Sequence, residues 1–322
     1  MLSGSPPLED PRDRPIGVFD SGVGGLTVLH ELLVSLPRED FLYLGDSARL
    51  PYGTRAPHEL HAFAVEVGEE LLTRGVKLLV VACNSATATA LEHLRGHVTA
   101  TGREIDVIGV VGPESNLAVA ATRSGRIGLL ATPATVASGA YERAVQSADA
   151  LTRLTSVACP DLAGIIEQDA PVTRRMVETV RSYCAPLVDA RVDTVILGCT
   201  HYPLVRPMLQ RILGPDVRLI TSGAAMVRRV QHALSVRDLV TLRTGEGHYG
   251  FLTTGDAARF RASGTRFLQL PIEEVEHVDV TTRAAAGAPR RQRRSAPTAG
   301  RPTACAPPRS SPASCAPRPA RP

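Results

Sequence analysis

The chain has 322 residues, of which 43 % are hydrophobic and 21 % charged, with a formal net charge of +4. This length predicts about two domains. No apolar run approaches the roughly 18 residues of a membrane-spanning helix, and residues 1–14 are polar and proline-rich, which argues against a membrane protein and a secretory signal. We therefore expect a cytoplasmic protein whose cysteines stay reduced.

The positive charge comes from the C-terminal segment. Residues 283–322 contain nine Arg and nine Pro, and no acidic, aromatic, Val, Ile, Leu or Met residue. Such a composition cannot bury enough apolar surface to offset the entropy of ordering, so the segment is predicted to be a disordered tail. The rest of the chain has 27 basic and 32 acidic residues, a formal charge of −5, which gives no reason to expect nucleic acid or a membrane surface as a partner.

Short apolar runs alternate with amphipathic stretches from residue 16 onward, which is typical of a parallel α/β sheet. The apolar runs are continuous, as in strands covered on both faces. Apolar residues at helical spacing predict helices that include 27–36, 57–74 and 173–189. The predicted strands are Ile16–Phe19, Phe41–Leu44, Leu78–Ala82, Asp106–Val110, Arg126–Leu130, Leu154–Ala158, Thr194–Leu197 and Val217–Ile220.

Two stretches of the chain repeat at a similar offset. Residues 74–83 match residues 190–199 in pattern, 116 positions apart, and residues 15–21 resemble residues 126–132, 111 positions apart. A duplicated α/β unit explains both matches. Because open parallel sheets bind ligands at the carboxyl ends of their strands, two similar units that face each other are expected to form one cleft between equivalent strand ends.

Each copy of the repeat ends in a cysteine, Cys83 or Cys199, which are expected to face each other across the cleft. Two thiols on opposite sides of a carbon can remove a proton from one face and deliver another to the opposite face. A free thiol is only a few per cent ionised at neutral pH, so each needs a supporting group. His201, two residues after Cys199, and Asp20, at the end of the first predicted strand, are the candidates.

Neutral hydrogen-bond donors surround these positions. The glycine-rich loop 20–25 lacks the third glycine of a dinucleotide fingerprint, so NAD is rejected, but its amides and Ser21 can bind a carboxylate. Asn84 and Ser85 follow one thiol and Thr200 follows the other, while a loop around Tyr52 and Gly53 can close over a ligand. Such a pocket suits a small dicarboxylic amino acid.

Other functions compete with the hypothesis that two thiols exchange protons with a small dicarboxylic amino acid. Cys199 and His201 could form the nucleophile and base of a thiol hydrolase, although Cys83 then has no role. A racemase that uses pyridoxal phosphate needs a Schiff-base lysine, and the single lysine, Lys77, lies at the start of a strand. A non-catalytic binding module, or a racemase of aspartate or hydantoins, also remains open. The cysteine spacing fits no zinc site, so neither metal nor cofactor is expected.

The chain resembles the cofactor-independent aspartate/glutamate racemase family, and glutamate racemases in particular. The matching motifs run in the family's order from about residue 14 to 280. They are Gly17–Val28, Gly45–Ser47 with Pro51–Gly53, Ala82–Ala86, Gly128–Thr135, Ala158–Pro160 and Leu197–Leu204.

The resemblance implies an isomerase that interconverts L- and D-glutamate without a cofactor and supplies D-glutamate for bacterial peptidoglycan. It implies that Cys83 and Cys199 are the acid/base thiols and that Asp20 and His201 support them. The sequence does not give the oligomeric state, and a homodimer is one possible assembly. The resemblance places a further acid near the second thiol, at Glu167. The substrate-binding residues that it implies are Asp20, Ser21, Tyr52, Gly53, Asn84, Ser85, Thr200 and His201.

The implied fold is two similar α/β domains with parallel sheets, related by pseudo-two-fold symmetry, with the active site in the cleft between them. The first domain is expected to span residues 14–107 and to close again with 222–282. The second is expected to span residues 108–221.

Overall fold

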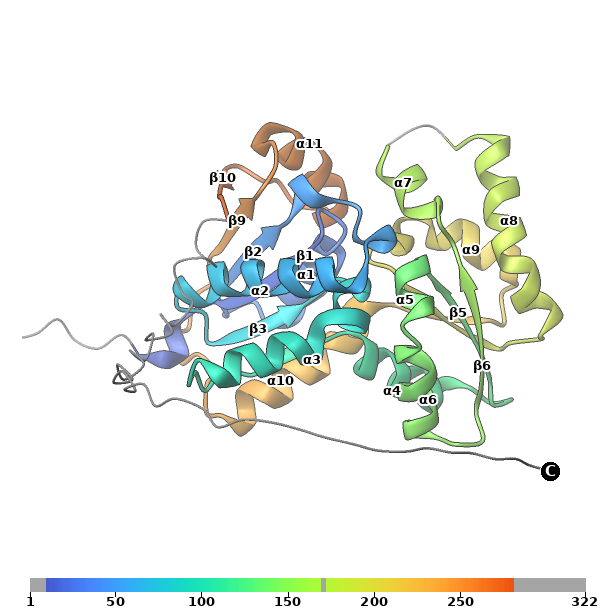
Figure 1. The fold of residues 1–322 in the computed structure, drawn as a ribbon, viewed down its shortest axis with the longest axis horizontal. Coiled ribbons are helices and arrows are strands. Elements are labelled where there is room, and N and C mark those ends of the chain that lie inside the picture. The colour runs from blue at the N-terminus through green and yellow to red at the C-terminus, as the bar shows by residue number, and fades with distance from the viewer. Residues whose placement is uncertain (1–9, 169–171, 281–322) are drawn as a thin grey trace, which may run out of the picture. The chain divides into compact units, whose positions relative to one another are not determined.

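The computed structural model describes residues 10–168 and 172–280, and it contains two parallel β-sheets covered by helices, which confirms the predicted α/β class (Figure 1). The tail predicted over 283–322 lies outside the described residues. The first sheet has the order β10-β9-β2-β1-β3-β4, with β1 (Ile16–Asp20), β2 (Phe41–Gly45), β3 (Leu78–Val81), β4 (Val107–Gly109), β9 (Tyr249–Thr253) and β10 (Glu276–His277). The second has the order β6-β5-β7-β8, with β5 (Arg126–Ala131), β6 (Arg153–Ala158), β7 (Thr194–Gly198) and β8 (Arg218–Ile220).

All eight predicted strands are present as β1 to β8, but β9 and β10 were not predicted. The sequence of β9 begins Tyr249-Gly250, without the continuous apolar run that marks the other strands. β10 has two residues, both exposed, and pairs with β9. Both strands lie at one edge of the first sheet, where pairing to a neighbour rather than local sequence decides the structure.

The two sheets share one topology. Strands β2-β1-β3-β4 of the first sheet recur in the second as β6-β5-β7-β8, in the same order. The register recurs as well, because Ile16 pairs with Leu78 in the first sheet and Ile127 pairs with Thr194 in the second. These pairs are related by the same offsets that relate the repeated sequences, which supports a duplicated unit.

Eleven α-helices connect these strands within the described residues, and the three predicted helices are among them with ends that agree to within one residue. The helices are α1 (Leu26–Ser35), α2 (Pro57–Thr73), α3 (Asn84–Ala100), α4 (Val111–Ala121), α5 (Pro133–Ala137), α6 (Ala140–Ala148), α7 (Leu162–Glu167), α8 (Arg174–Asp189), α9 (Arg206–Leu213), α10 (Ser222–Val236) and α11 (Ala257–Leu268). None of the helices in the described part of the chain is long and apolar enough to span a membrane.

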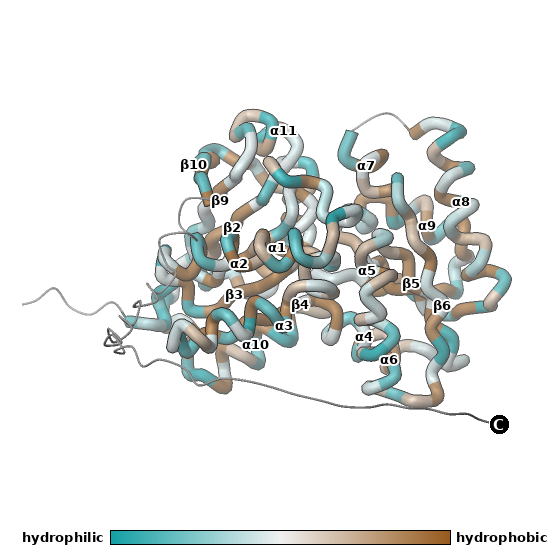
Figure 2. Tube along the Cα trace, viewed as in Figure 1, coloured by the Kyte–Doolittle hydropathy of each residue, from teal (hydrophilic) through white to brown (hydrophobic). Residues whose placement is uncertain are grey.

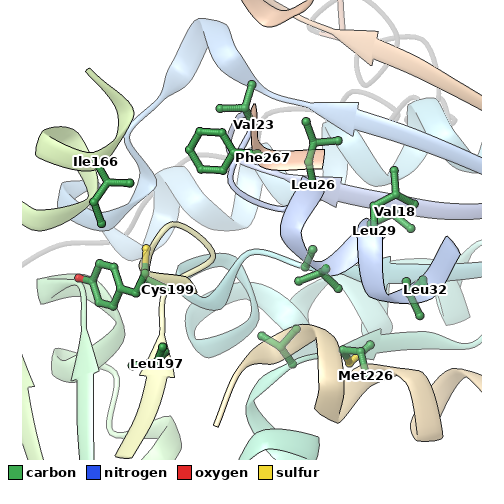
Figure 3. Close-up of a cluster of buried hydrophobic side chains, with 14 of the residues drawn as sticks. Val18, Val23, Leu26, Leu29, Leu32, Ile166, Leu197, Cys199, Met226 and Phe267 are labelled. Carbon is green, nitrogen blue, oxygen red and sulfur yellow. The ribbon is translucent and has the colours of Figure 1, made fainter. Parts of the chain in front are cut away.

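The chain passes between the sheets twice. Helix α4 leads from β4 to β5, and α10 leads from β8 back to β9; the two helices pack against each other. Figure 2 shows that the strands are mostly hydrophobic, while the helices mix polar and apolar residues. One hydrophobic cluster contains residues of both sheets, including Val18 of β1 and Leu197 of β7 (Figure 3). Both sheets lie in one compact unit, and their division into the two predicted domains stays a prediction.

Candidate active site

A cavity of about 370 Å³ lies at the carboxyl ends of β1, β3, β5 and β7, the equivalent central strands of the two sheets. Both cysteines of the repeat line it. The predicted binding residues that also line it are Ser21, Tyr52, Gly53, Asn84, Ser85, Thr200 and His201. The strand ends thus bring together residues from four distant parts of the chain, as the repeat predicts.

Cys83 caps the helix that follows β3. Its sulfur accepts a hydrogen bond from the backbone N–H of Ala86 at 3.4 Å, and the side chain is buried. Burial raises the pKa of the Cys83 thiol well above its usual range, and the neighbouring charge of Asp20 adds to this rise, while contacts with Ala86 and Ser21 oppose it. Cys83 is therefore a protonated thiol at neutral pH.

Cys199 follows β7 on the other wall and has an imidazole beside it. Its sulfur lies 3.8 Å from Nδ1 of His201, and both side chains are buried. Figure 3 shows Cys199 at the end of the strand that carries Leu197. A β-carbon on Gly24 would overlap Thr200 and lie 2.5 Å from His201 Nδ1. Glycine at position 24 thus allows the loop 20–25 to approach the wall that carries Cys199 closely.

His201 is flanked by a second acid. Its Nε2 lies 3.5 Å from Oε2 of Glu167, a distance suited to an ion pair but too long for a good hydrogen bond. Burial lowers the pKa of His201, but its contacts with Cys199 and Glu167 and the charge of Asp20 outweigh burial and raise that pKa to about 10. The contact with His201 in turn lowers the pKa of Glu167. The ring is therefore a cation at neutral pH and can stabilise negative charge on the sulfur beside it.

Asp20 does not line the cavity. It is fully buried behind the wall, where it accepts hydrogen bonds from the Gly22 amide at 3.1 Å and from the Thr200 hydroxyl at 3.3 Å. Burial raises its pKa, and the positive charge of His201 opposes the rise. Asp20 thus acts on the cavity through its neighbours, and its Thr200 contact joins the first sheet to the second.

Another hydrogen bond also joins the two walls, and it involves a residue that the sequence did not single out. Ser85 Oγ, on α3, lies 2.9 Å from Oγ1 of Thr132, which caps α5 and lines the cavity. Thr132 is the counterpart of Ser21 in the repeat of 111 residues. That alignment is the signal that could have identified it.

The loop with Tyr52 and Gly53 is held from behind by a buried carboxylate. Asp46 accepts hydrogen bonds from the Tyr52 hydroxyl, from Arg49 Nε at 2.7 Å and from Thr254 Oγ1 at 2.7 Å. A β-carbon on Gly53 would lie 2.7 Å from Thr132, so only glycine fits there. The loop therefore forms a fixed wall of the cavity.

Asn84 lines the cavity, but its side-chain amide is bonded into a network behind the wall. The amide donates to the Tyr141 hydroxyl at 2.8 Å and to Glu114 Oε2 at 3.1 Å. Its side chain is thus already engaged by protein partners. The backbone N–H groups at the start of α3 remain suited to a carboxylate, as at other helix N-termini.

Among the residues that the structure describes, neither a cluster able to hold a metal ion nor an accessible lysine accompanies the thiols. In residues 10–168 and 172–280, no cluster of His, Cys, Asp and Glu could hold a metal ion. Lys77 precedes β3, at the opposite end of the strand from Cys83, and its Nζ lies 2.5 Å from Oε2 of Glu39. The one lysine of the chain thus forms a buried ion pair.

Known proteins are similar to this chain over most of its length. The model of the Asp/Glu/Hydantoin racemase family matches residues 26–230. A glutamate racemase of Streptococcus mutans is 42 % identical over 267 residues, which cover 83 % of this chain and 98 % of the relative. The crystal structure of glutamate racemase RacE1 from Bacillus anthracis superimposes with a TM-score of 0.78 at 36 % identity, covering 83 % of this chain and 98 % of that one. A glutamate racemase from Francisella tularensis in complex with D-glutamate gives 0.77 at 31 % identity, covering 84 % and 99 %.

Proposed function

Because the chain belongs to the Asp/Glu/Hydantoin racemase family and is an isomerase with glutamate racemase activity, we propose that Cys83 and Cys199 are the two acid/base groups of its reaction. The observation that carries this proposal is that both thiols line one cavity, each at the carboxyl end of an equivalent strand in a different sheet. A substrate held between them has one sulfur toward each face of its α-carbon.

The proton transfers balance without any redox step. The thiolate of one cysteine takes the α-proton and becomes a thiol, and the electron pair of the broken C–H bond stays on the substrate as a carbanion. The other thiol then gives its proton to the opposite face, forms the new C–H bond and is left as a thiolate. General acid–base catalysis of this kind contributes about 10²–10⁴-fold, so positioning and charge stabilisation must supply the rest.

Each thiol serves one enantiomer in this proposal. Cys199, beside the His201 cation, takes the proton of L-glutamate, and Cys83, supported by Asp20, takes that of D-glutamate. The raised pKa of Cys83 supports a resting state in which this thiol is protonated and ready to deliver a proton. Cys83 is therefore the acid in the conversion of L- to D-glutamate.

The substrate carboxylates are bound mainly by neutral donors. Ser21, Thr132 and Thr200 line the cavity, as do residues at the start of α3. Hydroxyl and amide donors can bind the substrate carboxylates without adding a formal charge near the carbanion. The remaining expected binding residues are Tyr52, Gly53, Asn84, Ser85 and His201, with Asp20 acting from behind the wall.

The cellular setting follows from the chemistry. Thiols that exchange protons must stay reduced, which favours the cytoplasm. The four cysteines among the described residues are all free. The family implies that the D-glutamate supplies peptidoglycan synthesis. A homodimer remains part of the proposal, and size-exclusion chromatography with light scattering would measure it.

Solvent isotope incorporation tests the two-thiol reaction. With L-glutamate in heavy water, the D-glutamate formed in the first turnovers is expected to carry deuterium at the α-carbon, because the delivering thiol has exchanged its proton with solvent. The recovered L-glutamate should stay protonated at first. Mass spectrometry of the separated enantiomers measures both. D-glutamate that retains the original proton would contradict the proposal, since it requires a single base that acts on both faces.

A further inference from the structure

A buried polar network lies beside the cavity, and the carboxylate at its centre has no part in the mechanism above. Glu114, on α4, is fully buried, and its carboxylate accepts hydrogen bonds from Tyr141 on α6 and Ser222 on α10. Asn84, on α3, donates to it at 3.1 Å and to the Tyr141 hydroxyl at 2.8 Å. Side chains from four helices therefore meet at one carboxyl group.

Three of those helices lie at the connections between the sheets or directly after Cys83. Helices α4 and α10 are the two segments that carry the chain between the sheets. Helix α3 begins directly after Cys83, and Asn84 is its first residue. The network thus connects both crossings of the chain to the segment that holds the Cys83 thiol.

We propose that Glu114 is a positioning residue, which through Asn84 sets where the Cys83 thiol stands in the cavity and holds both crossover helices against that wall. This inference rests on the proposed acid/base role of Cys83. Glu114 itself does not line the cavity and takes no part in the proton transfers.

The strength of the hydrogen bonds made by the Glu114 side chain depends on whether its carboxyl group is protonated. A charged carboxylate accepts from all three donors, and hydrogen bonds to a charged group are about twice as strong as neutral ones. A protonated carboxyl can donate its own hydrogen to one of the two hydroxyls, and all of its hydrogen bonds are then between neutral groups. The ionised form therefore holds Asn84 more firmly than the neutral form.

The surroundings place this ionisation near neutral pH. Burial raises the pKa of Glu114 to about 7, while hydrogen bonds from Ser222, Tyr141 and Asn84 oppose the rise. Helices α3 and α10, which pack against α4, present the uncharged side chains of Asn84 and Ser222 to Glu114. Helix α6, which also packs against α4, presents Tyr141, whose own pKa is raised by burial. β7 has no titratable side chain, and β8 has Arg218, which is exposed. We therefore expect the positioning effect to strengthen as pH rises through about 7.

The first test compares Glu114→Gln with the native chain. Glutamine keeps the shape and cannot ionise, and the titration of the thiols is common to both enzymes and cancels in the ratio of their kcat values. Native kcat divided by variant kcat is expected to rise at least threefold between pH 6 and 8.5, in both directions, by a circular-dichroism assay. Glu92→Gln, which removes an exposed carboxylate of α3, is the matched control and should give a constant ratio. A constant ratio for Glu114→Gln would overturn the inference.

Tyr141→Phe sharpens this test. It removes a donor that favours the charged carboxylate, so the midpoint of the pH-dependent change should move to higher pH without disappearing. An unshifted midpoint would mean that another group is responsible and would contradict the assignment to Glu114.

Thermal unfolding provides a readout that does not depend on activity. The folded-state pKa of about 7 lies above the ordinary value of 4.5, so the folded protein binds more protons than the unfolded chain between these pH values. Stability from this group is therefore lost as pH rises from about 4.5 to 7 and stays constant above that. Glu114→Gln should lack this loss, so the variant's Tm minus the native Tm should grow by a few degrees between pH 5 and 8. A constant difference would overturn ionisation at Glu114 and leave the proposed function standing, whereas activity retained by Cys83→Ser would overturn the proposed role of Cys83 and leave the ionisation of Glu114 standing.

Discussion

The two thiols follow equivalent strands, yet their surroundings differ. After Cys83 the chain continues with Asn84 and Ser85, and after Cys199 it continues with Thr200 and His201. Cys199 therefore has an imidazole at 3.8 Å, while the sulfur of Cys83 contacts the Ala86 amide at 3.4 Å and Ser21. The carboxylate that acts on Cys83 is Asp20, from another strand.

This difference separates two contributions to the site. The repeated strand, with its thiol at the carboxyl end, provides the position of each group, and it is the same in both halves. The residues beside each thiol control its protonation, and they differ between the two halves. Cys199 has a histidine with a pKa of about 10 beside it, whereas Cys83 has the buried carboxylate of Asp20. A reaction in which one thiol takes a proton while the other gives one requires such an unequal pair.

Replacing either thiol is the strongest way to test this comparison. Cys83→Ser and Cys199→Ser are each expected to lower kcat by about 10³-fold or more in both directions, because every turnover uses both groups and a hydroxyl is a far weaker acid than a thiol. Circular dichroism at saturating L- and D-glutamate measures the loss.

A third buried cysteine provides the control. Cys184, on α8, does not line the cavity, and burial raises its pKa to about 11. Cys184→Ser should keep kcat within about threefold, even though a buried hydroxyl costs some stability. A Cys83→Ser variant as active as Cys184→Ser would break the comparison, because one thiol would then suffice.

Removing the imidazole makes the two halves more alike. His201→Asn is expected to slow the conversion of L- to D-glutamate by about tenfold or more, since the sulfur of Cys199 loses the cation beside it. The equilibrium between enantiomers cannot change, so the kcat/KM values must fall by the same factor in both directions, and the asymmetry must appear in the separate kcat and KM values. Equal changes of kcat in both directions would show that the two halves do not divide the work.

The smallest effect is expected from the acid behind the imidazole. Glu167→Gln removes a charge that helps raise the pKa of His201, so that pKa should fall below about 10. Activity that depends on the protonated ring should then be lost at lower pH than in the native enzyme, while kcat at pH 7 changes less than about threefold. A pH–rate profile in the L-to-D direction measures the shift. An unchanged alkaline limb would mean that Glu167 does not act through His201.

Much of this site was predictable because the repeat is visible in sequence. Continuous apolar runs revealed eight strands, and the matching cysteines indicated which strand ends meet. Asp20 shows the limit of this reasoning. Its place after β1 was predicted, but only the structure shows that it lies behind the wall and reaches the second sheet through Thr200.

Glu114 could not have been predicted as part of the site. A glutamate in an amphipathic stretch is usually a solvated residue, and nothing in the local pattern shows that three other helices cover it. Its partners Asn84, Tyr141 and Ser222 are 30, 27 and 108 positions away. Only tertiary packing brings them together, as it also does for β9 and β10 at the sheet edge.

Two of the hydrogen bonds that join the walls of the cavity also bear on how a product leaves. Thr200 donates to Asp20, and Ser85 bonds to Thr132, so each sheet contributes to both links. Any motion that separates the walls breaks both of them, and each contributes about 0.5–1.5 kcal/mol. An open form would then be about 5–150-fold less populated than the closed one on this account alone. Both enantiomers would leave through this same open form, so a change in its population would act on turnover in both directions.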